Sequence, residues 1–186
     1  RFDSARRVWE SALIESWVHG DSSMSARLLT ELGFAARNLN DLGKARALED
    51  SALALERALG MRNDFARSLN ALGLISRDAN QNAEAAEFFE QSLAAAAAVA
   101  DSEGVAKAIG NAGLAYDALG DHVRARRGYR TLRDAGRKLG NAVYEGNGLT
   151  NEASVDVAEG DARSALARLD TALALYEAEE NLTGVQ

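Results

Sequence analysis

The stretch NALGLISRDANQNAEAAEFFEQSL, residues 70–93, decides the fold because its small residues recur at a fixed interval along the chain. Forty residues separate the successive members of two columns, which read Gly33, Gly73, Gly113, Ala153 and Ala5, Ala45, Ala85, Ala125, Ala165. No insertion interrupts either column. A period of this length is typical of a solenoid, in which each repeat packs on its neighbours.

The composition indicates that each repeat is helical. The chain has no proline, and Ala, Leu, Arg and Glu, which favour helices, are abundant. Glycine just after a helix and Asp or Asn just before the next one mark helix ends, at HGD 19–21, DLG 41–43, LGMRND 59–64, ALGD 118–121, LGN 139–141 and EGD 159–161. These marks predict helices of roughly 14 to 18 residues joined by short turns.

The small residues predict where the helices cross. Two antiparallel helices joined by a tight turn approach to about 8 to 10 Å only where Gly or Ala faces the partner. The glycine column lies on the first helix of each pair and the alanine column on the second. A third column places a bulky residue on the second helix, at Trp9, Phe89, Tyr129 and Leu169, with Glu49 as the exception.

We therefore predict an all-α solenoid of antiparallel helix hairpins, with about nine helices, that forms a single array over residues 1–186. The predicted units are 24–60, 64–100, 104–140 and 144–180. A half repeat at 1–20 precedes them, and a further repeat begins at 181–186. This register predicts that the chain is a fragment of a longer array.

Three segments resemble tetratricopeptide repeats (TPRs): ELGFAARNLNDLGKARALEDSAL (31–53), ALGLISRDANQNAEAAEFFEQSL (71–93) and NAGLAYDALGDHVRARRGYRTL (111–132). They share a Leu-Gly pair, a turn with Asn or Gly-Asp, an alanine and an aromatic residue. The period is 40 rather than about 34 residues, and the closing proline is absent. Such longer repeats are similar to those of bacterial regulators, signal-transduction ATPases and Pins/LGN-like adaptors. The resemblance implies a right-handed superhelix whose first helices line a concave peptide-binding groove.

The net charge and the absence of known motifs argue against several classes of function. The net charge of −7 argues against binding to nucleic acid or to an anionic membrane. The longest apolar run, LAAAAAVA at 93–100, is too short to span a bilayer, and we expect a cytoplasmic location. The chain has no cysteine, its two histidines lie beside turns, and GNAVYEGNG lacks the lysine of a phosphate loop. We expect no enzyme activity, no cofactor and no metal.

The groove face of the first helices supplies the candidate binding residues. Helical spacing places on it Arg27, Phe34, Arg37, Arg67, Asn70, Leu74, Arg77, Lys107, Asn111, Asn147 and Asn151. Arginine forks and amides suit an acidic or carboxylate-bearing peptide. In the alternative interpretation, Arg27 pairs with Glu31 on its own helix, which contributes only about 0.2 to 0.5 kcal/mol, and the other residues are solvated.

The fourth hairpin departs from the pattern because acids continue along its face at Glu152, Asp156 and Glu159. Two explanations stay open: the helix is rotated, or the unit depends on a following repeat. The favoured function is a protein-interaction scaffold that binds a peptide or partner segment in the groove. The alternative is a sensor or regulatory arm of a multidomain bacterial transcription regulator or ATPase. Exposed array ends also predict self-association.

Overall fold

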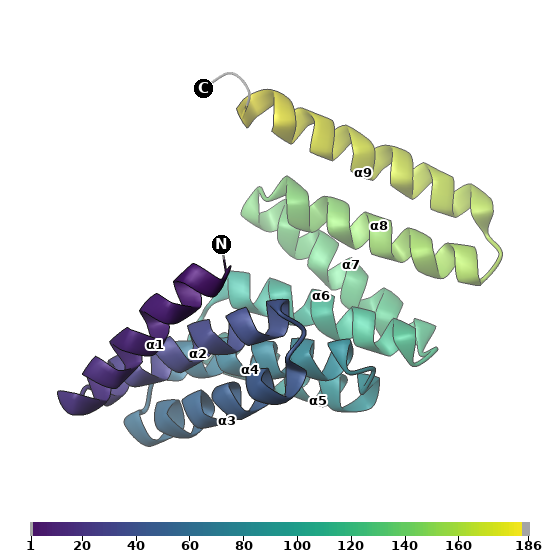
Figure 1. The fold of residues 1–186 in the computed structure, drawn as a ribbon. Helices are drawn as coiled ribbons and strands as arrows, with labels where there is room; N and C mark the ends of the chain where they lie inside the picture. Colours follow the sequence, from purple (N-terminus) through teal and green to yellow (C-terminus); the bar gives the residue numbers. More distant parts are fainter. Residues whose placement is uncertain (1, 184–186) are drawn as a thin grey trace. The chain divides into compact units, whose positions relative to one another are not determined.

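The structure is a computed structural model that describes residues 2–183, with the side chains of residues 7–180. Within that range the elements are α-helices joined by short turns (Figure 1). The helices are α1 (Phe2–Val18), α2 (Ser22–Asn38), α3 (Leu42–Leu59), α4 (Arg62–Asp78), α5 (Asn82–Ala98), α6 (Ser102–Ala118), α7 (His122–Leu139), α8 (Ala142–Ala158) and α9 (Ala162–Thr183).

The described chain divides into two compact units, residues 2–104 and 105–183. In the first unit, α1 packs on α2, α2 on α3, α3 on α4, and α4 on α5. In the second unit, α6 meets α7 at Gly113 and Tyr129, α7 packs on α8, and α8 packs on α9. Neighbouring helices within a unit run antiparallel (Figure 1). The predicted all-α fold of antiparallel hairpins is confirmed.

A residue with positive φ stands at every twentieth position and forms each turn. These residues are Gly20, Asn40, Gly60, Asn80, Ala100, Gly120, Gly140 and Gly160. Asparagine tolerates the left-handed conformation better than other non-glycine residues, which explains two of the three exceptions. Two sequence marks were therefore misplaced: Gly43 lies inside α3, and Asp64 lies in the first turn of α4.

The residue after each left-handed position directly precedes the next helix. Six such residues accept a hydrogen bond from the backbone N–H three positions on, namely Asp21, Asp41, Asp101, Asp121, Asn141 and Asp161. This capping satisfies an otherwise unpaired donor. The first helices consequently start at residues 22, 62, 102 and 142, two positions before the predicted unit starts.

The last helix differs from the others at the same register. α9 continues through position 180, where the register would place another turn, and ends at Thr183. Residues 184–186 of the predicted further repeat lie outside the described residues. The start of another repeat at 181–186 and a single array over 1–186 stay predictions.

Two hairpins are closed by a glycine on the first helix that faces an aromatic ring on the second. A Cβ built on Gly73 would lie 2.5 Å from the Phe89 ring, and one on Gly113 would lie 2.6 Å from the Tyr129 ring. Both aromatic side chains are fully buried. The glycines therefore make room for aromatic anchors, which is the physical reason for the forty-residue glycine column.

Candidate functional site

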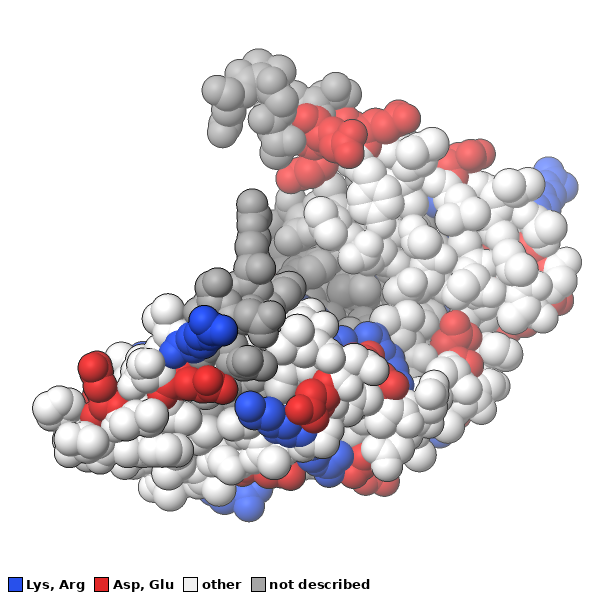
Figure 2. Space-filling model, viewed as in Figure 1, with Lys and Arg blue, Asp and Glu red and all other residues white. Residues whose placement is uncertain are grey.

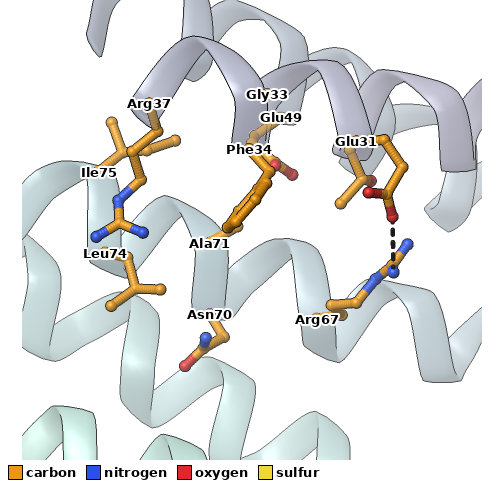
Figure 3. A pocket seen from close by; sticks show the side chains of 11 residues that line it. Glu31, Gly33, Phe34, Arg37, Glu49, Arg67, Asn70, Ala71, Leu74 and Ile75 are labelled. Atoms are coloured by element: carbon orange, nitrogen blue, oxygen red, sulfur yellow. Dashed lines mark hydrogen bonds and ion pairs between the residues drawn. The ribbon is translucent and has the colours of Figure 1, made fainter. Parts of the chain in front are cut away.

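A pocket of about 260 Å³ opens between α2 and α4 of the first unit. Five residues predicted for the groove lie in its wall: Phe34, Arg37, Arg67, Asn70 and Leu74. Figure 3 shows the Phe34 ring near the centre, Arg67 with Glu31 at one end, and Arg37 with Leu74 at the other. The remaining lining residues are Thr30, Glu31, Gly33, Glu49, Ala71 and Ile75.

The floor of this pocket is Glu49, which α3 contributes. It occupies the position that Phe89 and Tyr129 hold in the following hairpins, opposite the glycine of the first helix. A Cβ on Gly33 would lie 2.6 Å from Glu49 Oε1, so only glycine leaves space for this carboxyl group. The close helix crossing that contains an aromatic ring in the next two hairpins therefore contains a carboxyl group in this one.

Glu49 is fully buried and lacks a hydrogen-bond donor. Its relative exposure is 0%, and neither carboxyl oxygen accepts a hydrogen bond from any residue that the structure describes. Burial and, after it, the nearby charge of Glu56 raise the pKa of Glu49 to about 8. Arg67 and the Ser68 hydroxyl act in the opposite direction on this pKa. The carboxyl is therefore mostly protonated at neutral pH.

A line of buried polar groups runs beside Glu49. The Ser68 hydroxyl donates to Glu56 Oε1 at 2.9 Å and lies 3.3 Å from the Thr30 hydroxyl. Burial raises the pKa of Glu56 as well, and its Oε2 has no partner among the described residues. The first unit thus buries two acids, of which one is partly satisfied by a serine and the other is not.

The charged groups at the rim pair with one another between α2 and α4. Arg67 Nη1 lies 3.4 Å from Glu31 Oε1, and Arg37 Nε donates to Asp78 Oδ2 at 2.6 Å. Arg27 lies 3.7 Å from Asp64. The alternative pairing of Arg27 with Glu31 along one helix was wrong, because α4 approaches α2 closely enough to supply partners for both residues.

Comparison with known proteins identifies the fold. No protein-family model and no curated protein sequence matches the chain. Among solved structures, BtubC from P. vanneervenii matches with a TM-score of 0.85 at 20% identity, over 96% of this chain and 74% of that one. A signal-transduction ATPase with a tetratricopeptide repeat sensor, from Pyrococcus horikoshii, matches with a TM-score of 0.81 at 17% identity, over 97% of this chain and 29% of that one.

The fold is TPR-like.

A Rap protein in complex with competence and sporulation factor has the same fold, with a TM-score of 0.71 at 13% identity, over 92% of this chain and 55% of that one. At such identities the likeness shows the TPR-like fold alone. The resemblance that the repeats carry in the sequence is therefore confirmed for the fold.

The other predicted residues lie outside the α2–α4 pocket. Arg77 is on α4 and lies 3.7 Å from the neighbouring Asp78. The second TPR-like unit carries Lys107 and Asn111 on α6 and Asn147 and Asn151 on α8. The Asn147 Oδ1 accepts a hydrogen bond from the Tyr176 hydroxyl at 2.8 Å. Figure 2 shows acidic and basic side chains next to one another on the visible face.

The acidic face of the fourth hairpin has an explanation that neither sequence hypothesis contained. Glu152 is fully buried and lies 2.7 Å from Arg133 Nη1, 3.4 Å from Arg130 Nε and 3.5 Å from Arg168 Nε. Asp156 pairs with Arg168 and, at 2.5 Å, with Arg126, which also pairs with Glu159 at 2.7 Å. Arginines from α7 and α9 therefore compensate these acids.

The first and last helices of the TPR-like fold expose apolar side chains. Leu166, Leu169 and Leu173 of α9 are 62%, 41% and 56% exposed, and their spacing places them on one face. On α1, Val8, Ile14 and Trp17 are similarly exposed. These faces are where the predicted self-association would occur.

Within residues 2–183 no helix has the length and apolarity needed to cross a membrane. The described side chains also include no group of three or more His, Cys, Asp or Glu residues with the geometry of a metal site.

Proposed function

We propose that this TPR-like protein is an interaction scaffold in which the α2–α4 pocket receives a side chain of a bound peptide or partner segment. The proposal is supported by one pocket, at which residues predicted for the groove come together from two successive hairpins. Glu49, which has no hydrogen-bond partner among the described residues, forms its floor. A buried polar group without a partner costs stability, and a buried acid with a strongly shifted pKa in a cleft is a candidate functional group.

The size and lining of the pocket support binding of a single side chain. Its volume of about 260 Å³ is below that of most pockets for drug-sized molecules, which start near 300 Å³. The Phe34 side chain is 48% exposed, and Leu74 and Ala71 are half-buried beside it. These apolar surfaces would be removed from water by an inserted side chain, which favours binding.

An acidic peptide, which the arginines of the predicted groove face favour, would have to compete with acids already bound at this pocket. It would have to displace Glu31 from Arg67 and Asp78 from Arg37. Exposed ion pairs of this kind contribute about 0.2 to 1 kcal/mol each, so displacement is feasible but lowers the net gain from a carboxylate. Shape and apolar contact therefore carry more of the proposed binding than the arginines do.

The test is selection of peptides from a displayed random 12-residue library on the immobilised protein, followed by affinity measurement with two matched variants. Ala71→Phe fills the pocket, whereas Ala83→Phe places the same ring on the exposed start of α5. We expect Ala71→Phe to weaken the selected peptides at least about tenfold, or 1.4 kcal/mol, and Ala83→Phe to leave affinity within about twofold.

Far-UV circular dichroism of both variants controls for folding. Equal affinity of the two variants, or a library that yields no binder, would contradict peptide binding in this pocket.

A second candidate function is a sensor or regulatory arm of a larger protein. The observation that favours it is the match to the tetratricopeptide repeat sensor of the Pyrococcus horikoshii ATPase. The complete reading frame tests this alternative. A nucleotide-binding or helix-turn-helix segment encoded beside the TPR-like segment would support it, and a stand-alone array would count against it.

A further inference from the structure

The carboxyl group of Glu49 indicates which chemical group enters the pocket. Phe89 and Tyr129 show that the fold accommodates an apolar or aromatic side chain at this register. An acid with two unpartnered oxygens at the same register is therefore not needed for packing, and it destabilises the unliganded protein. A group that donates hydrogen bonds and carries positive charge would remove that cost.

We propose that the α2–α4 pocket binds a primary ammonium group on an alkyl stem, with the ammonium against Glu49 and the stem along Phe34 and Leu74. This inference rests on the proposed function, because it assumes that the partner binds in this pocket. It adds the chemical identity of the group that enters the pocket. In a protein partner, that group would be a lysine side chain.

The charges that surround Glu49 favour a cation over an anion. The ionisable groups that act on it are Glu31 from α2, Glu56 from α3 and Arg67 from α4. Two of the three are acids. The two arginines that line the pocket are both already paired, Arg67 with Glu31 and Arg37 with Asp78. A cation beside Glu49 lowers the pKa of this carboxyl, so the group releases its proton to solvent when the ammonium binds.

The shape of the pocket favours a slender group. Glu49 lies at the floor, and Phe34, Ala71, Leu74 and Ile75 also line the pocket (Figure 3). An ammonium is a compact charge with three donors, and the methylenes behind it pack on apolar surface. The two carboxyl oxygens of Glu49 can then both accept hydrogen bonds from one bound group.

The proposal is tested with three probes that share a four-carbon stem: n-butylammonium, n-butanol and n-butyrate. The protein is labelled with ¹³C-glutamate, and the Glu49 Cδ resonance is assigned by its loss in Glu49→Gln. We expect n-butylammonium to lower the pKa of Glu49 from about 8 to about 7 or below, whereas butanol and sodium chloride at matched ionic strength leave it unchanged.

The Cδ resonance of Glu56 serves as a control within the same sample. Glu56 is also fully buried and has a raised pKa, but it is not among the residues that line this pocket. The pKa of Glu56 should therefore change much less than the pKa of Glu49 when n-butylammonium is added.

Affinity should depend on pH in a defined direction. With a pKa of about 8, Glu49 is ionised in about one molecule in ten at pH 7 and in about nine in ten at pH 9. An alkylammonium keeps its charge over this range because its pKa is near that of lysine, about 10.4. The dissociation constant of n-butylammonium should therefore fall about tenfold between pH 7 and pH 9, and Glu49→Gln should abolish this dependence.

Two further probes separate the sources of the ammonium group. These are the tripeptide Gly-Lys-Gly, acetylated and amidated at its ends, and its norleucine counterpart. Tighter binding of the lysine peptide than of n-butylammonium identifies a polypeptide source, and equal binding identifies a free alkylamine; both support the ammonium assignment.

An unchanged pKa of Glu49 with n-butylammonium, or preferential binding of n-butyrate, would overturn the assignment. If the peptides selected from the library still lose affinity with Ala71→Phe, the scaffold function stands and only the chemistry of the inserted group is wrong.

Discussion

The two units of the molecule bury acids in opposite ways. In the first unit, Glu49 and Glu56 are fully buried with no arginine or lysine within ion-pair distance among the described residues. In the second unit, Glu152 and Asp156 are equally buried, but Arg133, Arg168 and Arg126 pair with them. Burial alone therefore does not set the charge state of an acid; the partners around it do.

The difference has a physical cause in the cost of desolvating a charge. An acid that is buried with arginines keeps its charge, and the ion pairs offset its desolvation. An acid buried without them takes up a proton instead, as the raised pKa of Glu49 indicates. The first unit therefore has a titrating group at the floor of a pocket, whereas the second has a fixed ion-pair network.

The largest expected effect is on the pH dependence of stability in the first unit. The pKa of Glu49 is about 8 in the folded protein against an ordinary value of 4.5. Between these pH values the folded state keeps a proton that the unfolded chain has lost, so stability falls as pH rises. The total loss should be about 5 kcal/mol, complete above about pH 8. Glu56, whose pKa is also raised, adds to it with the same sign.

Urea unfolding followed by tryptophan fluorescence measures this loss, because both tryptophans, Trp9 and Trp17, lie on α1 of the first unit. Glu49→Gln should remove most of the slope between pH 5 and pH 8. A wild-type stability that stays level over this range would show that Glu49 is not held protonated.

The next largest effect on stability should come from replacing Glu49 with the residue that the neighbouring hairpin has at the same position. Glu49→Phe recreates the contact of Phe89 with its facing glycine and removes the carboxyl. We expect the free energy of unfolding at pH 7 to rise by about 3 kcal/mol. This is the part of the stability loss from keeping Glu49 protonated that has accumulated by pH 7. Urea unfolding with the same fluorescence readout measures the gain.

The reciprocal exchange, Phe89→Glu, is the matched control. It should lower stability by about 3 to 5 kcal/mol, because a buried aromatic side chain is lost and an acid without a partner replaces it. If Glu49→Phe destabilises the protein instead, Gly33 and Gly73 do not leave equivalent space.

The smallest expected effect concerns the paired acids of the second unit. Glu152→Gln leaves Arg133 and Arg168 facing a neutral amide. Loss of a buried ion-pair partner costs about 3 to 5 kcal/mol; we expect about 2, because these two arginine side chains are 23% and 24% exposed. Thermal unfolding followed by circular dichroism measures the change.

Glu159→Gln is the control, since Glu159 pairs with Arg126 but its side chain is 50% exposed. It should cost no more than about 1 kcal/mol. Equal effects of the two substitutions would mean that burial does not separate the acids of this network.

Much of the fold was predictable because helix length, turn residues and the small-residue columns are local properties of the sequence. The turns at Asn80 and Ala100 escaped prediction, since neither position has glycine. Gly43 resembles a turn residue in the sequence but lies inside α3, and Asn40 forms the turn instead. An alanine in the left-handed backbone conformation is unfavourable by about 1 to 2 kcal/mol, and no sequence pattern predicts one.

The candidate pocket was predictable only in part. Helical spacing places Phe34 and Arg37 on one face of α2. The partners of Arg37 and Arg67 lie on the other hairpin in each case, and they depend on how closely α2 and α4 approach. Glu49 was visible as an exception in the column of bulky residues, although its burial without a donor was not. The arginines opposite Glu152 stand in α7 and α9, and spacing within α8 cannot reveal them.

The left-handed residue at every twentieth position also bears on how the length of such a protein can change. Removal of residues 61–100 would join Gly60 to Asp101, a glycine followed by a capping aspartate, as already occurs at Gly20 and Asp21. Unequal recombination in units of forty codons therefore creates no new kind of turn. A gene of this kind can gain or lose whole hairpins in one event, and each added hairpin can evolve its own residue opposite the glycine.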